Sequence, residues 1–157
     1  MSHLQEEIKQ KKPFESLAQE VVLNVMRTAA TFRKGVAETL KPFELTAPQY
    51  NILRILRGAP EDGLPCSEVG DRLVGQDPDV TRLLDRLEKR GLVTRGRSVM
   101  DRRVVNAIIT TAGLELVDQL DGPINTVHET QLGHMKKKRL RELIELLEKA
   151  RGDEEEE

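Results

Sequence analysis

Residues 77–113 read DPDVTRLLDRLEKRGLVTRGRSVMDRRVVNAIITTAG, and this stretch decides the fold. Pro78, the acidic residues beside it and Gly91 are typical of the start and the stop of a short helix. Between Val80 and Leu87 the apolar residues recur at i, i+3, i+4 and i+7, which predicts one buried face. The opposite face carries arginine, lysine and aspartate, so we expect a short amphipathic helix with a charged outer side.

Two β-rich runs, 92–97 and 103–110, follow this helix directly and enclose the polar loop 98–102. They predict a β-hairpin with a strongly basic tip. A basic helix followed at once by a basic hairpin is the sequence form of a winged helix-turn-helix. The helix fits the major groove of DNA, and the arginines of the hairpin reach phosphates or the narrow minor groove.

Individual residues at fixed positions in and after the hairpin make this pattern more specific. Asp101-x-Arg103, followed by Thr110 and Gly113, resembles the DxR wing signature and the subsequent Thr-x-x-Gly of the MarR (multiple antibiotic resistance regulator) family. The run LLDRLEKRGLV at 83–93 is also similar to the recognition helix of that family and its exit. The resemblance implies a mostly α (α+β) fold, with a winged helix-turn-helix DNA-binding lobe and long N- and C-terminal dimerisation helices.

The chain is expected to form one MarR-like unit over residues 1–157, with the winged lobe at 45–110, dimerisation helices at 14–40 and 111–151, and a disordered acidic tail at 152–157. The first long helix is predicted to hold Pro13 in its opening turn, after a polar and mobile lead-in, and to close at Lys41-Pro42. In the helix that follows the wing, Gly122-Pro123 predicts a kink rather than an end.

Three shorter features complete the expected lobe. Thr46 is predicted to cap a helix that has Pro48 just inside it. Leu64-Pro65 is predicted to add a short third strand beside the wing. Residues 67–73 are expected to form the first, positioning helix of the helix-turn-helix, where the small Gly70 suits a close crossing of two helices.

The apolar faces of the terminal helices are too large for a domain of this size to bury alone, which indicates a homodimer. The resemblance likewise implies that the first and last helices of two subunits interlock. A two-fold protein reads a palindrome and doubles its phosphate contacts. The expected partner is therefore a palindromic operator in double-stranded DNA.

The charge of the chain is distributed unevenly. It contains 25 basic and 27 acidic residues, a formal net charge of −2, and its last five residues are all acidic. Between Thr81 and Arg103, eight basic side chains stand against three acidic ones. Because the local field rather than the total charge steers a protein to DNA, this segment indicates nucleic-acid binding.

The expected DNA contacts come from the positioning helix, the turn, the recognition helix and the wing: Arg72, Gln76, Asp79, Thr81, Arg82, Arg86, Arg97, Ser98, Asp101, Arg102 and Arg103. Thr81 and Arg82 are expected to read base edges or phosphates, since the opening turn of the helix enters the groove. The alternative for both is a solvated helix face. Arg86 is expected to reach a phosphate.

The wing pair and the start of the recognition helix carry more specific expectations. The resemblance implies that Arg103 enters the minor groove and that Asp101 orients it through an ion pair. Without the resemblance, that pair would be an ordinary hairpin salt bridge contributing about 0–1 kcal/mol. Asp77 and Asp79 stand where the family more often has Ser, Thr or Lys. We expect Asp77 to cap the helix, whereas Asp79 either accepts a hydrogen bond from a cytosine amino group or repels phosphate.

The resemblance also implies a small, often aromatic and anionic ligand in a cleft between the dimer arms and the DNA lobe. The residues placed to line such a cleft are Phe32, Phe43, Tyr50, Arg54 and His128. The alternative is that these are core and surface residues without a ligand.

These observations predict a homodimeric transcriptional regulator, a repressor released by a small molecule. Two alternatives stay open: a winged-helix module that binds another protein, and a constitutive DNA binder without an effector. The sequence shows no nucleophile–base pair, phosphate loop or paired-carboxylate motif, so no enzymatic activity is expected.

No cofactor, metal or membrane is expected either. His128 and His134 do not share one helical face, so no metal site is predicted. Without a signal peptide or an apolar span, the chain is expected to be soluble and cytoplasmic. Cys66 is the single cysteine, which rules out an intrachain disulfide. It is either a small semi-buried residue or a redox-sensing thiol at a helix start.

Overall fold

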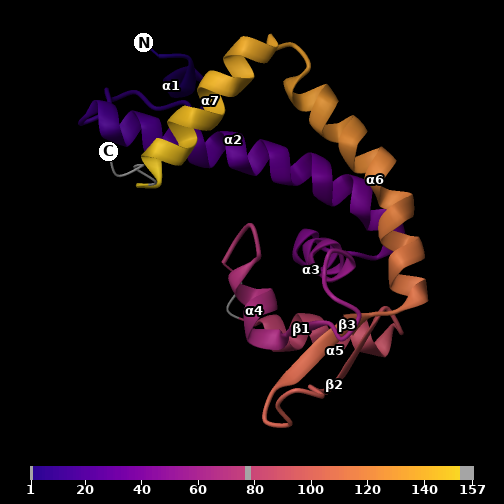
Figure 1. Ribbon diagram of the computed structural model, residues 1–157. Helices are drawn as coiled ribbons and strands as arrows, with labels where there is room; N and C mark the ends of the chain where they lie inside the picture. Colours follow the sequence, from indigo (N-terminus) through magenta and orange to yellow (C-terminus); the bar gives the residue numbers. More distant parts are fainter. Residues whose placement is uncertain (1, 77–78, 153–157) are drawn as a thin grey trace.

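The computed structural model describes residues 2–76 and 79–152. In chain order the elements are α1 (His3–Glu7), α2 (Leu17–Leu40), the 3₁₀ helix η1 (Lys41–Phe43), α3 (Ala47–Arg57), β1 (Leu64–Pro65), α4 (Cys66–Asp71), α5 (Val80–Lys89), β2 (Val93–Arg97), β3 (Val105–Ile109), α6 (Thr111–Leu132) and α7 (Lys137–Ala150). Figure 1 shows a winged lobe, formed by α3 to β3, below a frame of long helices made by α2, α6 and α7. The predicted mostly helical fold with a wing is confirmed.

The sheet of the winged lobe has the strand order β1-β3-β2, and both pairings are antiparallel. The hairpin register runs from Val93 opposite Ile109 to Arg97 opposite Val105. The predicted third strand at Leu64-Pro65 is present and pairs with β3.

The Thr-x-x-Gly at the start of α6 ties this helix to the exit of the recognition helix. Thr110 accepts a hydrogen bond from the amide of Gly113 at 3.1 Å and donates its hydroxyl to the carbonyl of Gly91 at 2.6 Å. A Cβ on Gly113 would lie 2.2 Å from the carbonyl oxygen of Leu92. Only glycine therefore lets α6 begin this close to the chain that leaves α5.

Two further helix boundaries follow the expected local chemistry. The hydroxyl of Thr46 accepts from the amide of Gln49, and the Gln49 side chain accepts from the Thr46 amide, which makes a capping box at the start of α3. A Cβ on Gly70 would lie 3.2 Å from Cγ2 of Val80, so the small residue does mark a close crossing of α4 and α5.

The core joins the winged lobe to the long helices. Its largest fully buried side chains come from the end of α2, from α3, α4, α5, β2 and α6: Leu40, Ile52, Leu53, Leu56, Val69, Leu84, Leu87, Val93, Val117 and Leu120. α2 and α6 pack side by side, and α3 and α5 contact each other below them. This packing holds α5 against α3 and the core.

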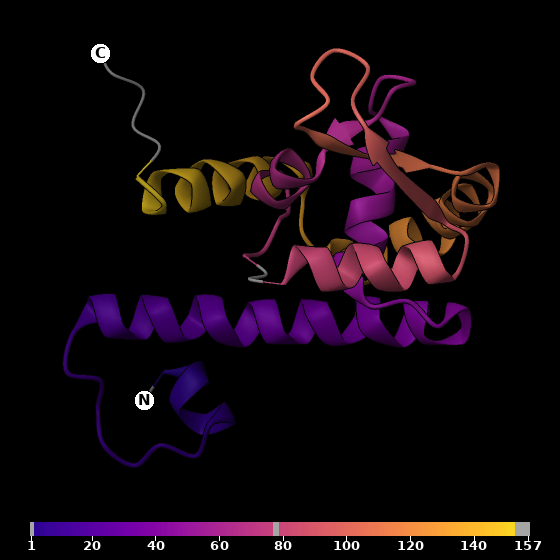
Figure 2. The ribbon, with the colours of Figure 1, turned by 90° about the horizontal axis from the view of Figure 1, so that it is seen from below.

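The N-terminal region differs from the expectation in two ways. α2 begins at Leu17 rather than near Pro13, because the hydroxyl of Ser16 caps the helix by accepting from the amide of Gln19. The lead-in is not simply polar and mobile, since it contains α1, in which Leu4 is buried. α2 extends well beyond the winged lobe with α1 beside it (Figure 2), and Arg27 pairs with Glu7 of α1 at 3.4 Å.

The two C-terminal helices are present where the sequence pattern predicts them. α6 continues through Gly122 and Pro123 and ends at Leu132, with Gly133 as its C-cap. α7 runs from Lys137 to Ala150. The predicted acidic tail lies, from residue 153 onward, outside the described residues. Throughout residues 2–76 and 79–152, no helix combines the length and the apolar character needed to traverse a bilayer.

Candidate nucleic-acid interface

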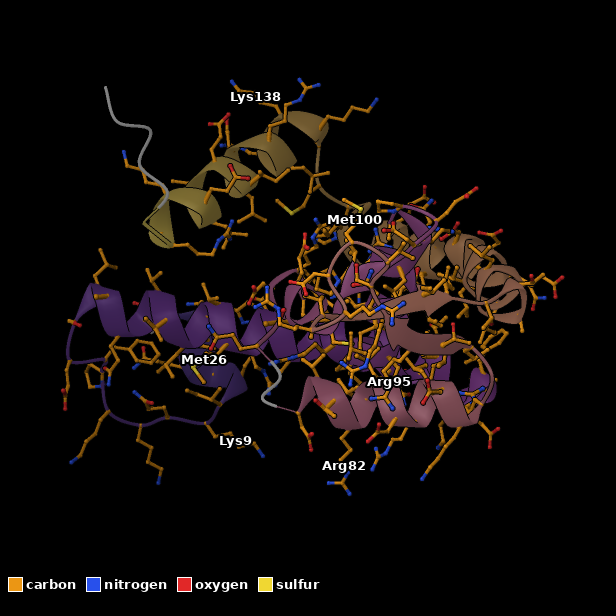
Figure 3. The ribbon with its side chains drawn as sticks, turned by 60° about the horizontal axis from the view of Figure 1, so that its bottom comes forward. Lys9, Met26, Arg82, Arg95, Met100 and Lys138 are labelled. Carbon is orange, nitrogen blue, oxygen red and sulfur yellow. The ribbon has the colours of Figure 1, made fainter. Side chains whose placement is uncertain are left out.

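Helix α5 presents an apolar face to the core and a charged face to solvent. Its buried residues are Leu83, Leu84 and Leu87. Thr81, Arg82, Arg86 and Lys89 are exposed. Figure 3 shows Arg82 projecting away from α5, and 68% of its side chain is accessible. The residues expected to read DNA from this helix are therefore available to a partner.

The cap of α5 is Asp79, so the expectation that Asp77 caps this helix is wrong. The carboxylate of Asp79 accepts a hydrogen bond from the amide of Arg82 at 3.3 Å and lies 3.9 Å from the Arg82 guanidinium. The helix begins at Val80, which makes Asp79 the residue in capping position. Asp77 itself lies outside the described residues.

The helix-turn-helix contributes two more expected contacts. Arg72, at the end of α4, is half exposed and forms an ion pair with Glu68 one turn earlier. Gln76 is exposed in the turn between α4 and α5. Both stand near the N-terminal end of the recognition helix in the chain.

The wing loop holds an exposed guanidinium in a defined position. Arg103 donates from Nε to Oδ1 of Asp101 at 3.1 Å and from Nη2 to Oδ2 at 3.2 Å, and its backbone amide donates to the same carboxylate at 3.0 Å. These hydrogen bonds hold the pKa of Asp101 below its usual value. The Arg103 side chain is 91% exposed. The expected ion pair is present, and it leaves the far side of the guanidinium open.

Two other expected wing contacts also order the loop. Nη1 of Arg97 donates to the carbonyl of Arg102 at 2.7 Å. The hydroxyl of Ser98 accepts from the amide of Met100 at 3.2 Å. Arg102 is exposed beside Arg103. These hydrogen bonds connect the loop to the hairpin strands, and the arginine side chains of the loop remain exposed to solvent.

Arg95 connects the wing to the recognition helix, a role that the sequence did not reveal. Its guanidinium pairs with Asp85 and, at 3.0 Å, with Glu88, and its amide donates to Glu88 at 2.9 Å. The hydrogen bonds from Arg95 lower the pKa of Glu88. Figure 3 shows Arg95 between α5 and the hairpin, and its side chain is only 23% exposed. Arg95 therefore belongs to the scaffold and not to the cations that face outward.

Arg90, the C-cap of α5, has a similar structural role. Its guanidinium donates to the carbonyls of Glu44 at 2.8 Å and Phe43 at 3.0 Å, in the turn after η1. All three acids of the basic segment 81–103 also pair with wing arginines: Asp85 and Glu88 with Arg95, and Asp101 with Arg103. Each acid of this segment is therefore already engaged by an arginine of the same segment.

A further ion-pair cluster joins the winged lobe to α6. Nη1 of Arg57 lies 2.8 Å from Asp118 and 2.7 Å from Asp121, and Nη2 donates to Asp121 at 3.1 Å. The hydrogen bonds to Arg57 lower the pKa of Asp121, and the two carboxylates raise the pKa of Arg57. Asp118 and Asp121 are one helical turn apart, but nothing in the local sequence indicates that Arg57 lies against them.

The five residues expected around a ligand are distributed over α2, η1, α3 and α6. The guanidinium of Arg54 lies over the ring of Tyr50, 6.0 Å from its centroid, and burial raises the pKa of Tyr50. Phe32 offers its carbonyl to Gln131 at 3.1 Å, Phe43 is half-buried against the core, and His128 is exposed. A shallow hollow of about 390 Å³ lies elsewhere between α2 and α6 and is lined by Gly35, Glu38, Thr39, Thr126, Val127, Thr130 and Gln131.

Cys66, at the start of α4, has the environment of a structural residue. Its side chain is half-buried, and burial raises the pKa of the thiol. A redox-sensing thiol needs the opposite shift, since the thiolate is the reactive form. The described parts of the chain also hold no group of three or more side chains suited to bind a metal ion.

Comparison with known proteins agrees with this geometry. The family model described as MarR family matches residues 45–105. The HTH-type transcriptional regulator TtmR of Methylorubrum extorquens (strain PA1) is 35% identical over 113 residues, which are 72% of this chain and 57% of that protein. The match thus spans little more than half the length of this curated relative.

Two solved structures extend the comparison to nearly the whole chain. A MarR transcription factor from Planctomyces limnophilus is 45% identical, with 87% of this chain and 98% of that chain covered and a TM-score of 0.66. CouR from Rhodococcus jostii RHA1, solved with p-coumaroyl-CoA bound, shares the fold at 22% identity, with 92% and 100% covered and a TM-score of 0.77.

Proposed function

Because this chain belongs to the MarR family of DNA-binding transcriptional regulators, we propose that it represses transcription by binding a palindromic operator as a homodimer. The family is one of regulators and not of enzymes. In this proposal residues 45–110 bind DNA, and the helices within 14–40 and 111–151 hold two subunits together. A dimer seated on an operator excludes other proteins from the same DNA, which is the physical basis of repression.

The observation that carries the proposal is the position of Arg103. Its guanidinium is 91% exposed, and the bidentate contact with Asp101 fixes its direction. Figure 1 shows the wing loop at the bottom of the lobe, on the same side as α5. An arginine held in this way suits the narrow minor groove, whose negative potential attracts it. With the wing in the minor groove, α5 would lie in the adjacent major groove.

The remaining contacts follow from this docking. Thr81 and Arg82, in the first turn of α5, would meet base edges, and Arg86 would meet a phosphate. Arg72 and Gln76, before α5, and Arg97, Ser98 and Arg102, in the wing, would add phosphate contacts. The carboxylate of Asp79 accepts a hydrogen bond from the amide of Arg82, so its role is to cap the helix that carries Thr81 and Arg82.

The dimer part of the proposal rests on apolar surface that the subunit does not cover. The exposed apolar residues of α2 are Leu17, Val21, Val22, Val25 and Met26. α7 contains no buried residue, and its Ile144 and Leu146 side chains are both exposed. No other described element packs extensively against α7. A second copy would cover both helices and would place two recognition helices on one face of the DNA.

Release by a small molecule is the final part of the proposal. CouR has been solved with p-coumaroyl-CoA, an aromatic and anionic compound. In this chain, Tyr50 and Arg54 pair a ring with a cation on α3, where the winged lobe meets the long helices. A bound aromatic anion would compete for that cation and change the angle of the lobe. DNA release by a panel of aromatic carboxylates, with Arg54→Ala as the unresponsive variant, tests this step.

Selection of bound DNA from a random pool tests the main proposal. Enrichment of a palindrome would establish both DNA recognition and two-fold symmetry. Failure to enrich any sequence, by protein that is folded and dimeric, would reject it and favour the alternative of a protein-binding module.

A further inference from the structure

The tip of the wing exposes two apolar side chains side by side in the sequence. Val99 is 90% exposed and Met100 is 89% exposed. Among the described residues, the other exposed large apolar side chains are Val74 in the turn before α5, the members of the α2 and α7 faces assigned to the dimer, Val105 of β3 and Ile8. Most of the exposed apolar surface of the described residues thus lies in two regions, the dimerisation helices and the DNA-binding side.

The loop presents these two side chains in an ordered conformation. The amide of Ser98 donates to the carbonyl of Val104 at 2.8 Å, and the amide of Val104 donates to the carbonyl of Asp101 at 2.9 Å. The amide of Met100 donates to the hydroxyl of Ser98 at 3.2 Å. The Asp101–Arg103 contact closes the other side of the turn. Because the loop is already ordered, it loses less conformational freedom on binding than a flexible loop would.

The charges around the tip indicate what covers it. Arg97, Arg102 and Arg103 surround Val99 and Met100, and the only acid of the loop, Asp101, is already paired with Arg103. A protein or a lipid surface would have to match these cations and the apolar tip with separate groups. A DNA groove offers both at once, since phosphates line its rims and sugars and base edges form its interior.

We propose that Met100 and Val99 enter the minor groove with Arg103 and pack against deoxyribose and base edges. Apolar side chains placed in this way sense the width and the floor of the groove. The amino group of guanine projects into the minor groove, whereas an A·T pair leaves the floor open. The wing would therefore favour A·T pairs beneath its tip by shape. This inference rests on the proposed function and adds a specificity determinant to it.

The test uses the full-length protein and its selected operator, with the base pairs under the wing located by hydroxyl-radical footprinting. A Val99→Ala, Met100→Ala double variant should bind about 10-fold more weakly, as expected when two apolar side chains lose partial burial. Its dependence on salt should equal that of the wild type, because no charge is removed. Arg102→Ala, by contrast, should reduce the salt dependence.

A second measurement isolates the groove floor. Replacing G·C by inosine·C under the wing removes only the amino group of guanine, and it should improve binding by the wild type much more than binding by the double variant. Val105→Ala is the matched control, since this valine lies in the hairpin stem and is 41% exposed. It should bind like the wild type.

Three results would overturn the inference. The first is equal affinity of the double variant and the wild type on an operator where Arg103→Ala binds weakly, since the tip would then stay in solvent. The second is an inosine effect of the same size in both proteins. The third is the absence of any selected DNA, which rejects the proposed function together with the inference, whereas the first two reject the inference alone.

Discussion

Arg103 and Asp101 face each other across the wing turn as a two-point contact, with Nε 3.1 Å from Oδ1 and Nη2 3.2 Å from Oδ2. This geometry makes an anionic residue part of a surface that is expected to bind a polyanion. The pair is nearly fully solvated on the arginine side, so it contributes little to folding. Its position can nevertheless decide where the guanidinium points.

Removal of Arg103 should separate DNA binding from stability. Arg103→Ala deletes one exposed cation, and the melting temperature should barely change because exposed ion pairs contribute about 0–1 kcal/mol. DNA affinity should fall at least about 10-fold, since both wings of a dimer lose a minor-groove arginine. Thermal unfolding and fluorescence anisotropy measure the two quantities. Unchanged affinity would show that the wing does not reach the DNA.

Removal of Asp101 gives two opposite expectations. Simple electrostatics predicts tighter DNA binding, because Asp101→Ala deletes a negative charge. If Asp101 acts by holding Arg103 in place, binding should instead weaken. We expect the second result by anisotropy, with Asp101→Asn intermediate because its amide retains one acceptor oxygen for Arg103. Tighter binding by Asp101→Ala would contradict the positioning role.

Replacement of Arg95 should act through the angle of the wing. Arg95→Met keeps much of the side-chain volume but loses the contacts with Asp85 and Glu88, and it leaves both acids facing the DNA side. We expect a loss of affinity with a smaller loss of stability, about 1 kcal/mol, since Arg95 is partly buried. The matched variant is Arg102→Met, which should leave the unfolding free energy unchanged. Equal losses of unfolding free energy in the two variants would argue against a role of Arg95 in fixing the wing to α5.

The assembly state tests the role of the long helices. Light scattering at micromolar concentration should report about twice the mass of 17.8 kDa. Val22→Glu and Leu146→Glu place charges on the exposed apolar sides of α2 and α7, and either should shift the equilibrium toward monomer. Ala30→Glu, on an exposed position of α2 outside that set, serves as a comparison. A well-folded wild-type monomer at this concentration would remove the basis for reading a palindrome.

Salt dependence tests the number of phosphate contacts. If Arg82, Arg86, Arg102 and Arg103 of each subunit displace counterions from the DNA, the dimer behaves as a protein with on the order of 6–10 phosphate contacts. Operator affinity should then fall by about 10³–10⁵-fold between 50 and 200 mM salt, as proteins with that many contacts do. A nearly flat dependence in a titration series would contradict docking of the two wings and two recognition helices.

Acid should weaken the link between α3 and α6. Arg57 lowers the pKa of Asp121 in the folded chain, so the ionised carboxylate stabilises the fold above its unfolded pKa of about 3.9. That contribution is lost as the pH falls through the lowered pKa. The difference in unfolding free energy between the wild type and Asp121→Asn should therefore be constant near neutral pH, at about 1 kcal/mol or less, and should shrink below about pH 4. Urea denaturation at pH 7 and pH 3 measures it, and a difference that grows in acid would contradict the assignment.

Local chemistry determined the elements of this protein. The i, i+3, i+4, i+7 pattern of α5, the two β-rich runs of the hairpin, the Thr46 capping box and the Thr110-x-x-Gly113 start of α6 each depend on residues within a few positions of one another. The sequence alone was therefore sufficient to predict the winged fold and the Asp101–Arg103 pair, whose members are two residues apart. The start of α2 was predicted near Pro13, but the helix begins at Leu17, after the Ser16 cap.

Tertiary structure alone decided which charges remain for a partner. Arg95 and Arg102 look alike in the basic segment, but packing of the hairpin on α5 places Arg95 against Asp85 and Glu88 and leaves Arg102 outside. Arg57 meets Asp121 across 64 positions of sequence. Ion pairs of this kind form because the buried core sets the distance between elements, and periodicity along one element carries no information about that distance.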